Sequence, residues 1–441
     1  MDRFHSSCFV RLDPACHIFV RPHGIERRVP CSSLQRYRAD VTRMNSSNLV
    51  FDWTTDFDYL DPQWTENPYS IWDELRAKCP IAHSERYLGT YLPTRYADIR
   101  AIAQDTEHFS SRRTILREGR PPLVPAPPLT SDPPEHKQQR RILVPRFTVE
   151  AVNALEPRTR SICRELIDKI AGKSGCDGAA DYAQHIPTRV TAYMLGVSEE
   201  AGALFRSWIE DFFELGIRDQ QAMMRVISEA RLFFMEEIQK RRADSSPGQD
   251  LVNFLLNARL EGEPLSDEYI CNTLRLLLFA GIDTTWSAIG SCLWHLANHA
   301  EDRVRLVAEP ELIPTAVDEF LRAYAPVTLA REIVKETRIG DCPFKKGEMV
   351  LMTFPAGNRD PEKFANADRV VLDRKPNPHL AFGAGIHRCI GENLARMEMK
   401  VALEEWLARF PDFAMADNAV VQWSRGPVRG PRELKLVLGD K

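Results

Sequence analysis

The chain has 441 residues, of which 44% are hydrophobic and 27% charged, and its formal net charge at pH 7 is −4. A chain of this length can form one large domain or several ordinary ones. The slightly acidic balance does not indicate nucleic-acid binding. Ten cysteines at irregular spacing, without a signal peptide, indicate reduced thiols rather than a disulfide framework. No uninterrupted apolar run approaches the roughly eighteen residues that cross a bilayer.

The first 43 residues differ in composition from the rest of the chain. They hold eight arginines and no lysine, and they show no amphipathic period. An arginine-rich, acid-poor segment is typical of an organellar transit peptide. The alternative is translated sequence upstream of a natural start at Met44.

From about Asn67 the pattern is that of a compact domain. We predict a helix over residues 69–77, short strands over 81–92 and a helix over 96–104. Residues 110–130 carry five prolines and four arginines, which excludes a regular helix and predicts a long ordered loop.

A helix start is predicted at Asp132, where an Asp-Pro-Pro sequence precedes a charged run. His136 and Arg140 lie four residues apart, so they share one face of this helix, and Pro145 should end it. Alone, such a pair is usually part of a solvated face.

Residues 149–243 are predicted to form successive amphipathic helices. Phe212 and Phe213 end an apolar series with helical spacing that starts at Phe205, and a turn follows near Gly216. By default these side chains belong to the core. Residues 245–250 are predicted to form a surface loop.

A long helix is predicted over residues 267–298, and its middle reads Ala280-Gly281-Ile282-Asp283-Thr284-Thr285. A glycine inside a helix costs about 1 kcal/mol relative to alanine. A buried carboxylate such as Asp283 is rare unless it is paired, and either threonine can donate to a carbonyl four residues earlier and bend the helix. The simplest interpretation is a glycine-kinked core helix, but this combination of unfavourable residues indicates a functional segment.

Glu319 and Arg322 lie three residues apart on a further predicted helix, so they can pair on one face. The pattern is common and weakly informative by itself. Arg331 follows nine residues after Arg322, and Arg374 lies fifteen residues before Cys389.

Cys389 stands at the centre of the most specific pattern in the chain. Glycines surround it at a density that indicates a tight backbone close to something flat. The helical spacing that follows puts the cysteine at a helix N-terminus, where amide hydrogens and the macrodipole favour a thiolate. The pattern consists of Phe382, Gly383, Gly385, His387, Cys389 and Gly391.

Two alternatives compete with a haem ligand at Cys389. An isolated cysteine is by default a buried structural residue. A zinc site would need more ligands than His387 and Cys389 supply, and the chain has no CxxC pair. A single thiolate suits haem better.

The glycine and cysteine pattern resembles the cysteine-ligand loop of the cytochrome P-450 family of haem-thiolate monooxygenases. The similarity runs from about residue 67 to the C-terminus, and four motifs come in the family's order: the His136/Arg140 pair, residues 280–285, the Glu319/Arg322 pair and the cysteine loop. The resemblance implies a mainly helical α+β fold with a small β lobe. It places haem b between the long helix and the cysteine loop.

The resemblance also implies a role for each matched residue. Cys389 would bind the iron, and the haem would further contact His136, Arg140, Ala280, Gly281, Arg331, Phe382, Gly383, His387 and Gly391. Asp283 and Thr284 would relay protons. Glu319, Arg322 and Arg374 would form a structural triad. Candidate substrate contacts are Phe212, Phe213, Val327, Thr328, Leu329 and Trp423.

The implied reaction inserts one oxygen atom from O2 into a small or medium apolar organic substrate. A thiolate ligand donates electron density to the iron and favours O–O cleavage. No flavin, nicotinamide or iron-sulfur pattern is present, so electrons are expected from a separate ferredoxin and ferredoxin reductase with NAD(P)H. The expected docking surface is a basic cluster of Lys137, Arg141, Arg388, Arg396 and Lys400.

Other functions on the same fold are a peroxide-driven oxygenase, an isomerase and a non-catalytic haem-thiolate sensor. The presence of Asp283 and Thr284 argues against the sensor, because a sensor needs no proton relay. The motifs resemble bacterial family members, so we favour a natural start at Met44. We therefore expect an extension over residues 1–43, disordered or upstream of that start, and a single catalytic domain over 44–441. The expected location is the cytoplasm, without a membrane span.

Overall fold

The computed structural model describes residues 49–119, 121–244 and 248–439, together with three short strands near the N-terminus. These strands, β1 (Leu12–Asp13), β2 (His17–Val20) and β3 (Arg27–Pro30), pair in that order as an antiparallel sheet. The chain divides into two compact units, residues 1–50 and 51–441. The rest of the predicted extension over residues 1–43 lies outside the described residues.

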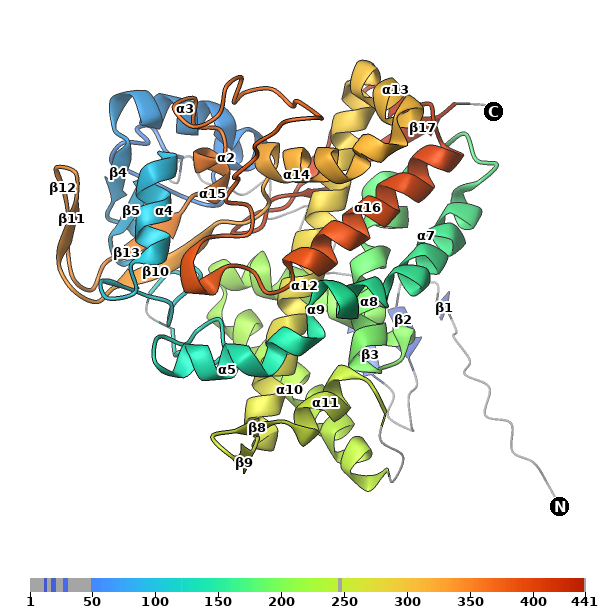
Figure 1. Cartoon of the computed structure of the whole chain (residues 1–441), viewed down its shortest axis with the longest axis horizontal. Coiled ribbons are helices and arrows are strands. Elements are labelled where there is room, and N and C mark those ends of the chain that lie inside the picture. Colours follow the sequence, from blue (N-terminus) through green and yellow to red (C-terminus); the bar gives the residue numbers. More distant parts are fainter. Residues whose placement is uncertain are drawn as a thin grey trace. The chain divides into compact units, whose positions relative to one another are not determined.

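The second unit is dominated by helices (Figure 1). In chain order they are α2 (Pro62–Glu66), α3 (Pro68–Lys78), α4 (Tyr96–Gln104), α5 (Glu135–Leu143), α6 (Val149–Asn153), α7 (Glu156–Ile170), α8 (His185–Leu195), α9 (Gly202–Phe213), α10 (Gln220–Ala243), α11 (Leu251–Asn257), α12 (Asp267–Asn298), α13 (Ala300–Ala308), α14 (Ile313–Ala323), α15 (Phe354–Gly357) and α16 (Glu392–Arg409). The mainly helical α+β fold predicted from the sequence is confirmed.

The strands of this unit form one larger sheet and several small ones. The larger sheet has the order β4-β5-β13-β10-β6, and only β5 and β13 are parallel. Its strands are β4 (Ile81–Ser84), β5 (Thr90–Pro93), β6 (Phe109–Ser110), β10 (Leu329–Ile333) and β13 (Met349–Met352). The small sheets are built from β7 (Gly175–Asp177), β8 (Arg259–Leu260), β9 (Glu263–Pro264), β11 (Thr337–Ile339), β12 (Cys342–Phe344), β14 (Phe413–Met415), β15 (Gln422–Trp423), β16 (Pro431–Glu433) and β17 (Lys435–Leu438).

Helix α12 is the central element of the helical part, drawn in yellow in Figure 1. Ser266 caps it, because its hydroxyl accepts a hydrogen bond from the amide of Tyr269. The helix packs against α8, α10 and α16, and apolar side chains from all four elements share one core. Its predicted bounds, residues 267–298, are confirmed.

An eighteen-residue window of α12 is apolar enough to cross a membrane, with a mean hydropathy of 1.4. The sequence prediction missed this window because scattered polar residues interrupt the apolar run. In the structure 72% of the window is buried inside the protein. Its apolar character therefore reflects the protein core.

Several local predictions before α12 agree with the structure. Helix α4 has the predicted bounds, and α5 ends at Leu143, where a short 3-10 turn that includes Pro145 follows. The described residues between β6 and α5 form no helix or strand. This loop is fixed to the core, since the Arg275 guanidinium of α12 donates to the carbonyl of Pro125 at 2.5 Å.

Candidate active site

The cysteine loop connects the β-rich part to α16. Two hydrogen bonds hold the backbone that precedes the cysteine. The amide of Leu380 donates to Asn358 Oδ1 at 2.6 Å, and the Tyr96 hydroxyl of α4 donates to the carbonyl of Pro378 at 2.8 Å. Inside the loop the amide of Cys389 donates to the carbonyl of Phe382 at 2.8 Å. These bonds position Cys389 from elements that are distant in sequence.

Two glycines of the loop need their left-handed backbone. Gly383 and Gly385 both have φ of +70°, a region that residues with a Cβ rarely adopt. A Cβ on Gly385 would also lie 2.6 Å from the carbonyl oxygen of Ala103 in α4. The close approach predicted from this glycine is therefore to the backbone of α4.

The prediction that Cys389 stands at a helix N-terminus needs a correction. Helix α16 begins at Glu392, with Gly391 as its N-cap, so the cysteine precedes the helix by three residues. The surrounding protein raises the pKa of the Cys389 thiol, while a hydrogen bond from the Gly391 amide and the charges of Arg140 and Arg396 lower it. The Cys389 side chain is nevertheless exposed in the described structure, so its thiol is accessible to a group bound beside the loop.

Four basic side chains from three elements gather beside the cysteine loop. The ring of His136 in α5 lies 4.2 Å from the ring of His387, measured between centroids. The Arg140 guanidinium donates to the carbonyl of Arg388 at 2.6 Å. Arg331 of β10 is buried, and its guanidinium donates to the carbonyl of Ala330.

No acid in the described part of the chain forms an ion pair with Arg140 or Arg331 of this cluster, although Asp132 and Glu392 act on it from further away. Burial and the neighbouring cations lower the pKa of His387 to about 3, and burial lowers the pKa of Arg331 to about 10. Burial and Arg140 also lower the pKa of His136. Among the described residues, the buried Nε2 atoms of His136 and His387 have no hydrogen-bond partner. The cluster is therefore suited to an anionic group.

The middle of α12 has an open side and a closed side. Ala280 is exposed and Gly281 and Thr284 are partly exposed, while Asp283 and Thr285 are buried. The Thr284 hydroxyl donates to the carbonyl of Ala280 at 2.8 Å, one of the two such bonds that the sequence allowed. Thr284 therefore lies on the open side and Thr285 on the closed side.

Asp283 has partners that the sequence did not reveal. Its carboxylate is 0% exposed, and Oδ1 lies 2.8 Å from Nη2 of Arg432 in β16. Burial and Glu214 raise the pKa of Asp283 to about 6, and Arg432 opposes this shift. The Asp283 side chain therefore has no direct contact with solvent in this conformation. Arg432 lies 149 residues further along the chain, so no local pattern could identify it.

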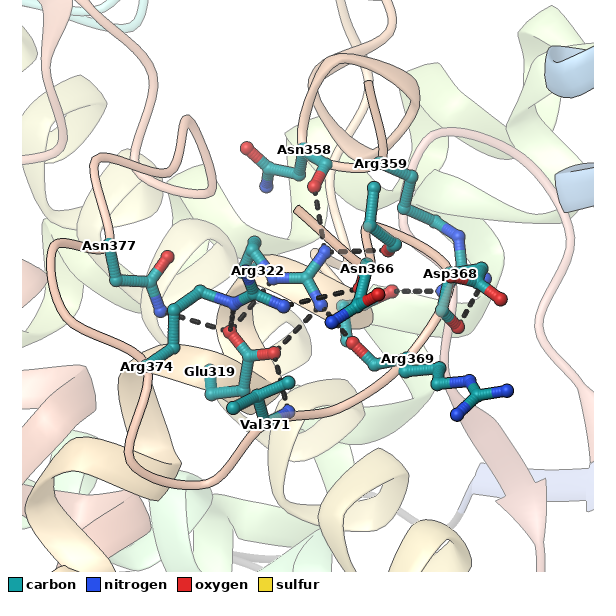
Figure 2. Close-up of polar contacts among 12 residues, drawn as sticks. Glu319, Arg322, Asn358, Arg359, Asn366, Asp368, Arg369, Val371, Arg374 and Asn377 are labelled. Carbon is teal, nitrogen blue, oxygen red and sulfur yellow. Dashed lines mark hydrogen bonds and ion pairs between the residues drawn. The ribbon is translucent and has the colours of Figure 1, made fainter. Parts of the chain in front are cut away.

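The structure brings Glu319, Arg322 and Arg374 together, as Figure 2 shows. The Arg322 guanidinium donates to both Glu319 oxygens at 2.8 Å, and Arg374 Nε donates to Oε2 at 2.9 Å. The amide of Val371 and the side chain of Asn377 donate to the same carboxylate. Glu319 and Arg322 are fully buried.

Arg322 extends this network to the segment that precedes the cysteine loop. Its guanidinium also donates to three backbone carbonyls, those of Asn358, Ala367 and Arg369, at 2.6–2.9 Å (Figure 2). One carboxylate and two guanidinium groups thus fasten α14 to residues 358–377.

The candidate substrate residues fall into separate groups. Phe212 and Phe213 pack on Phe279 of α12, with ring centroids 5.0 and 6.3 Å apart, directly before the open side at Ala280. Val327 bridges to Val428, the Thr328 amide donates to the carbonyl of Pro427, and the half-buried Leu329 begins β10. Trp423 instead packs on Trp294 near the end of α12 and beneath Arg429.

The predicted basic surface is partly neutralised. Arg388 pairs with Glu392 at 2.7 Å, Arg396 with Asp318 and Glu392, and Lys400 with Glu156. Within the described ranges, no ion pair is recorded for Lys137 or Arg141, which are exposed on α5. The cations of this predicted surface that are not paired with an acid therefore lie on α5.

Comparison with known proteins gives the chain its family. A family model for cytochrome P-450 matches residues 199–420. The mycinamicin IV hydroxylase/epoxidase of Micromonospora griseorubida is 34% identical over 376 residues, which cover 82% of this chain and 94% of that protein. The chain belongs to the cytochrome P-450 family.

Further cytochromes P-450 resemble the chain over most of its length. The biotin biosynthesis cytochrome P-450 of Bacillus subtilis is 32% identical over 85% of this chain and 96% of that protein. The structure of CYP109E1 from Bacillus megaterium in complex with testosterone matches 86% of this chain and 99% of its own, with a TM-score of 0.80 and 29% identity. CYP109Q5 from Chondromyces apiculatus matches 88% and 99%, with a TM-score of 0.80 and 33% identity.

Membership makes this chain a haem-thiolate monooxygenase, and the family's cofactor is haem b. The residues present fit that group. Haem b carries two carboxylates, and the cluster of His136, Arg140, Arg331 and His387 supplies buried cations and unpartnered donors. Cys389 supplies a thiol, and the glycines of its loop and of α12 leave little side-chain bulk.

Proposed function

We propose that this cytochrome P-450 inserts one oxygen atom from O2 into a small or medium apolar organic substrate by hydroxylation, epoxidation or dealkylation. The observation that carries the proposal is the open side of α12, where Thr284 stands beside exposed Ala280 and next to the buried acid Asp283. An apolar cluster of Phe212, Phe213 and Phe279 adjoins it. Relatives with names as different as mycinamicin IV hydroxylase/epoxidase and biotin biosynthesis cytochrome P-450 leave the substrate itself open.

The proposed haem contacts follow from the same geometry. Cys389 would bind the iron as a thiolate, a form that metal coordination stabilises. His136, Arg140, Arg331 and His387 hold the two propionates. Ala280 and Gly281 lie beside the haem, as do Phe382, Gly383 and Gly391 from the loop. When bound, the haem supplies the activation of O2.

Asp283 and Thr284 are the proposed catalytic residues. The cleavage of O2 consumes protons in a site lined by apolar side chains, so donors must be built into the protein. Thr284 presents a hydroxyl on the open side of α12. The pKa of the Asp283 carboxyl is raised to about 6, so this group can both bind and release a proton near neutral pH. Glu319, Arg322 and Arg374 are structural in this proposal.

The identity of the iron ligand tests the proposal. In the purified ferrous protein, carbon monoxide should give the absorption band of a thiolate-ligated haem. Cys389→His should move that band to the position of imidazole-ligated haem. A folded wild-type protein that already shows the imidazole band would refute the role of Cys389.

Electrons are proposed to come from NAD(P)H through a ferredoxin reductase and a ferredoxin, which is generally acidic. The exposed Lys137 and Arg141 on α5 are the docking cations least compensated by acids. Steering by this face predicts first-electron transfer that slows as salt rises past about 0.1 M, where the Debye length is about 10 Å. An unchanged rate would remove the electrostatic part of the proposal.

A peroxide-driven oxygenase is the alternative function, and a non-catalytic sensor is the weaker one. NADH-dependent turnover that requires the ferredoxin pair distinguishes the proposed monooxygenase from both. We place the protein in the cytoplasm, with residues 44–441 as one catalytic domain. An intact-mass measurement on protein from the native host would test the start at Met44.

A further inference from the structure

The buried carboxylate of Asp283 is half of a larger ionic arrangement. Arg432 lies between two acids, because its Nη2 is 2.8 Å from Asp283 Oδ1 and its Nε is 2.9 Å from Glu214 Oε1. Its Nη1 donates to the hydroxyl of Ser287 at 3.2 Å. The guanidinium also lies over the ring of Trp286, 4.2 Å from the centroid.

All three charged groups of this arrangement are shielded from solvent. The side chains of Asp283, Glu214 and Arg432 are 0%, 9% and 14% exposed. A buried ion pair is weak evidence for stability, because desolvation offsets much of the attraction. Two acids held on one guanidinium beside the candidate proton donor therefore call for a functional explanation.

The backbone places Arg432 with little freedom. The β15–β16 hairpin lies directly on α12, where a Cβ on Gly430 would be 2.3 Å from Cβ of Ser287. One turn further along the helix, a Cβ on Gly290 would be 2.7 Å from Cγ of Pro431. The hairpin and the helix can approach this closely only because one residue in each contact, Gly430 or Gly290, is a glycine. This close packing fixes the backbone of Arg432, so that its side chain reaches Asp283.

The contact leaves the Asp283 carboxylate able to exchange a proton. Arg432 Nη2 lies at ion-pair distance from Asp283 Oδ1, while Oδ2 has no hydrogen-bond partner among the described residues. One oxygen of the carboxylate therefore faces the guanidinium, and the other stays free to carry a proton.

We infer that Arg432 and Glu214 are positioning residues for Asp283: the shared guanidinium holds the acid in place and Glu214 limits how strongly it favours the ionised form. The inference rests on the proposed role of Asp283 in proton delivery. If Glu214 were absent, the charge of Arg432 would favour the ionised form of Asp283. If Arg432 were absent, burial would favour the protonated form. Sharing the cation with Glu214 keeps both forms accessible near neutral pH.

The charged surroundings of Asp283 are few. Arg432 from β16 and Glu214 from the turn after α9 are the charged groups that act on it among the described residues. Glu210, one turn earlier on α9, interacts electrostatically with Glu214 and Arg432. Arg206, a further turn earlier, interacts with Glu210. From α8, the neighbouring helix, the group that faces this turn of α12 is the Thr191 hydroxyl, near Gly281.

Infrared spectroscopy of the holoprotein tests the inference without turnover. The carbonyl stretch of protonated Asp283 is identified as the band that Asp283→Asn removes, and its intensity is followed against pH. In the wild type we expect a midpoint near pH 6. Arg432→Gln should raise the midpoint by about 1–3 pH units, the usual effect of an opposite charge at this distance.

Glu214→Gln should move the midpoint in the opposite direction, to lower pH, because Arg432 then acts on Asp283 alone. In Glu214→Gln the buried Arg432 keeps Asp283 as its partner, so this variant is expected to fold. It therefore tests the inference even if Arg432→Gln fails to fold. Glu433→Gln, on the same strand but paired with Lys435, is the control and should leave the midpoint unchanged. Equal midpoints in Glu214→Gln and the wild type would overturn the inference.

The outcome is separable from the proposed function. If the midpoints shift as expected while Asp283→Asn retains wild-type turnover, the arrangement tunes Asp283 but the acid does not deliver protons. If the midpoints do not shift while Asp283→Asn slows turnover, the proton role stands and the inference fails.

Discussion

At the scale of single residues, adjacent side chains on α12 have different surroundings. Thr284 is partly exposed on the open side and Thr285 is buried on the other side, although both could donate to the preceding turn. Successive residues on a helix point about 100° apart. One hydroxyl can therefore serve the reaction while its neighbour serves packing.

Thr284→Ala should uncouple the enzyme without preventing haem or substrate binding. Loss of the hydroxyl leaves proton delivery incomplete, so reduced oxygen should leave as hydrogen peroxide. We expect NADH consumption to continue while product per NADH falls, as measured with a substrate identified by its haem spin-state shift. Thr285→Ala is the matched control and should keep wild-type coupling. Wild-type coupling in Thr284→Ala would show that protons arrive by another route.

At the scale of elements, α14 and the segment before the cysteine loop depend on one buried carboxylate. Glu319→Ala would leave Arg322 buried without its partner, which typically costs about 3–5 kcal/mol. We therefore expect a large decrease in the urea midpoint of unfolding. Arg305→Ala breaks the exposed pair between Arg305 and Asp373 and should cost at most about 1 kcal/mol. Similar losses in both variants would contradict the structural role of Glu319.

The turn after α9 is packed against the loop of the β15–β16 hairpin. Gly426 has φ of +91°, and a Cβ there would lie 2.4 Å from Cδ1 of Ile217 and 2.7 Å from the carbonyl oxygen of Phe213. Gly347 has the same φ but nothing within 4 Å. An alanine at either position would have the same backbone strain, but only an alanine at position 426 would also clash with neighbouring atoms.

Gly426→Ala should destabilise the protein more than Gly347→Ala. Both variants carry the cost of a left-handed alanine, roughly 1–2 kcal/mol. Only Gly426→Ala also displaces the turn that carries Glu214. Thermal unfolding of the two purified variants is the measurement, and equal midpoints would show that the turn yields without cost.

At the scale of the whole molecule, the half-buried His185 on α8 contributes to the response to acid. Partial burial lowers its pKa to about 4. Unfolded histidines titrate near pH 6.5. Unfolding therefore takes up protons below that pH, and the stabilisation present above about pH 6.5 is lost as pH falls toward 4. Asp283 acts in the opposite sense, because its raised pKa favours the folded state at lower pH.

The apparent melting temperature should consequently fall between about pH 6.5 and 4. His185→Gln should reduce this fall, because one half-buried neutral imidazole no longer takes up a proton on unfolding. At pH 8, where the imidazole is neutral in both states, His185→Gln serves as its own control for packing effects. An identical pH profile in the variant and the wild type would contradict the prediction.

The sequence by itself determined the family, the mainly helical fold, the bounds of α4 and α12, the loop before α5 and the possibility of a threonine bond to the preceding turn of α12. These features depend on short-range rules: the period of a helix, the missing amide hydrogen of proline, and a glycine and cysteine spacing that chance rarely produces. Each can be read within one segment of the chain.

Only the tertiary structure decided the surroundings of those residues. It showed that Gly385 approaches α4, that Cys389 precedes α16 by three residues, and that Arg432 and Glu214 meet Asp283. Such contacts join residues far apart in the chain, and their strength depends on burial. Desolvation and long-range charge are properties of the packed molecule, so no local pattern in the sequence contains them.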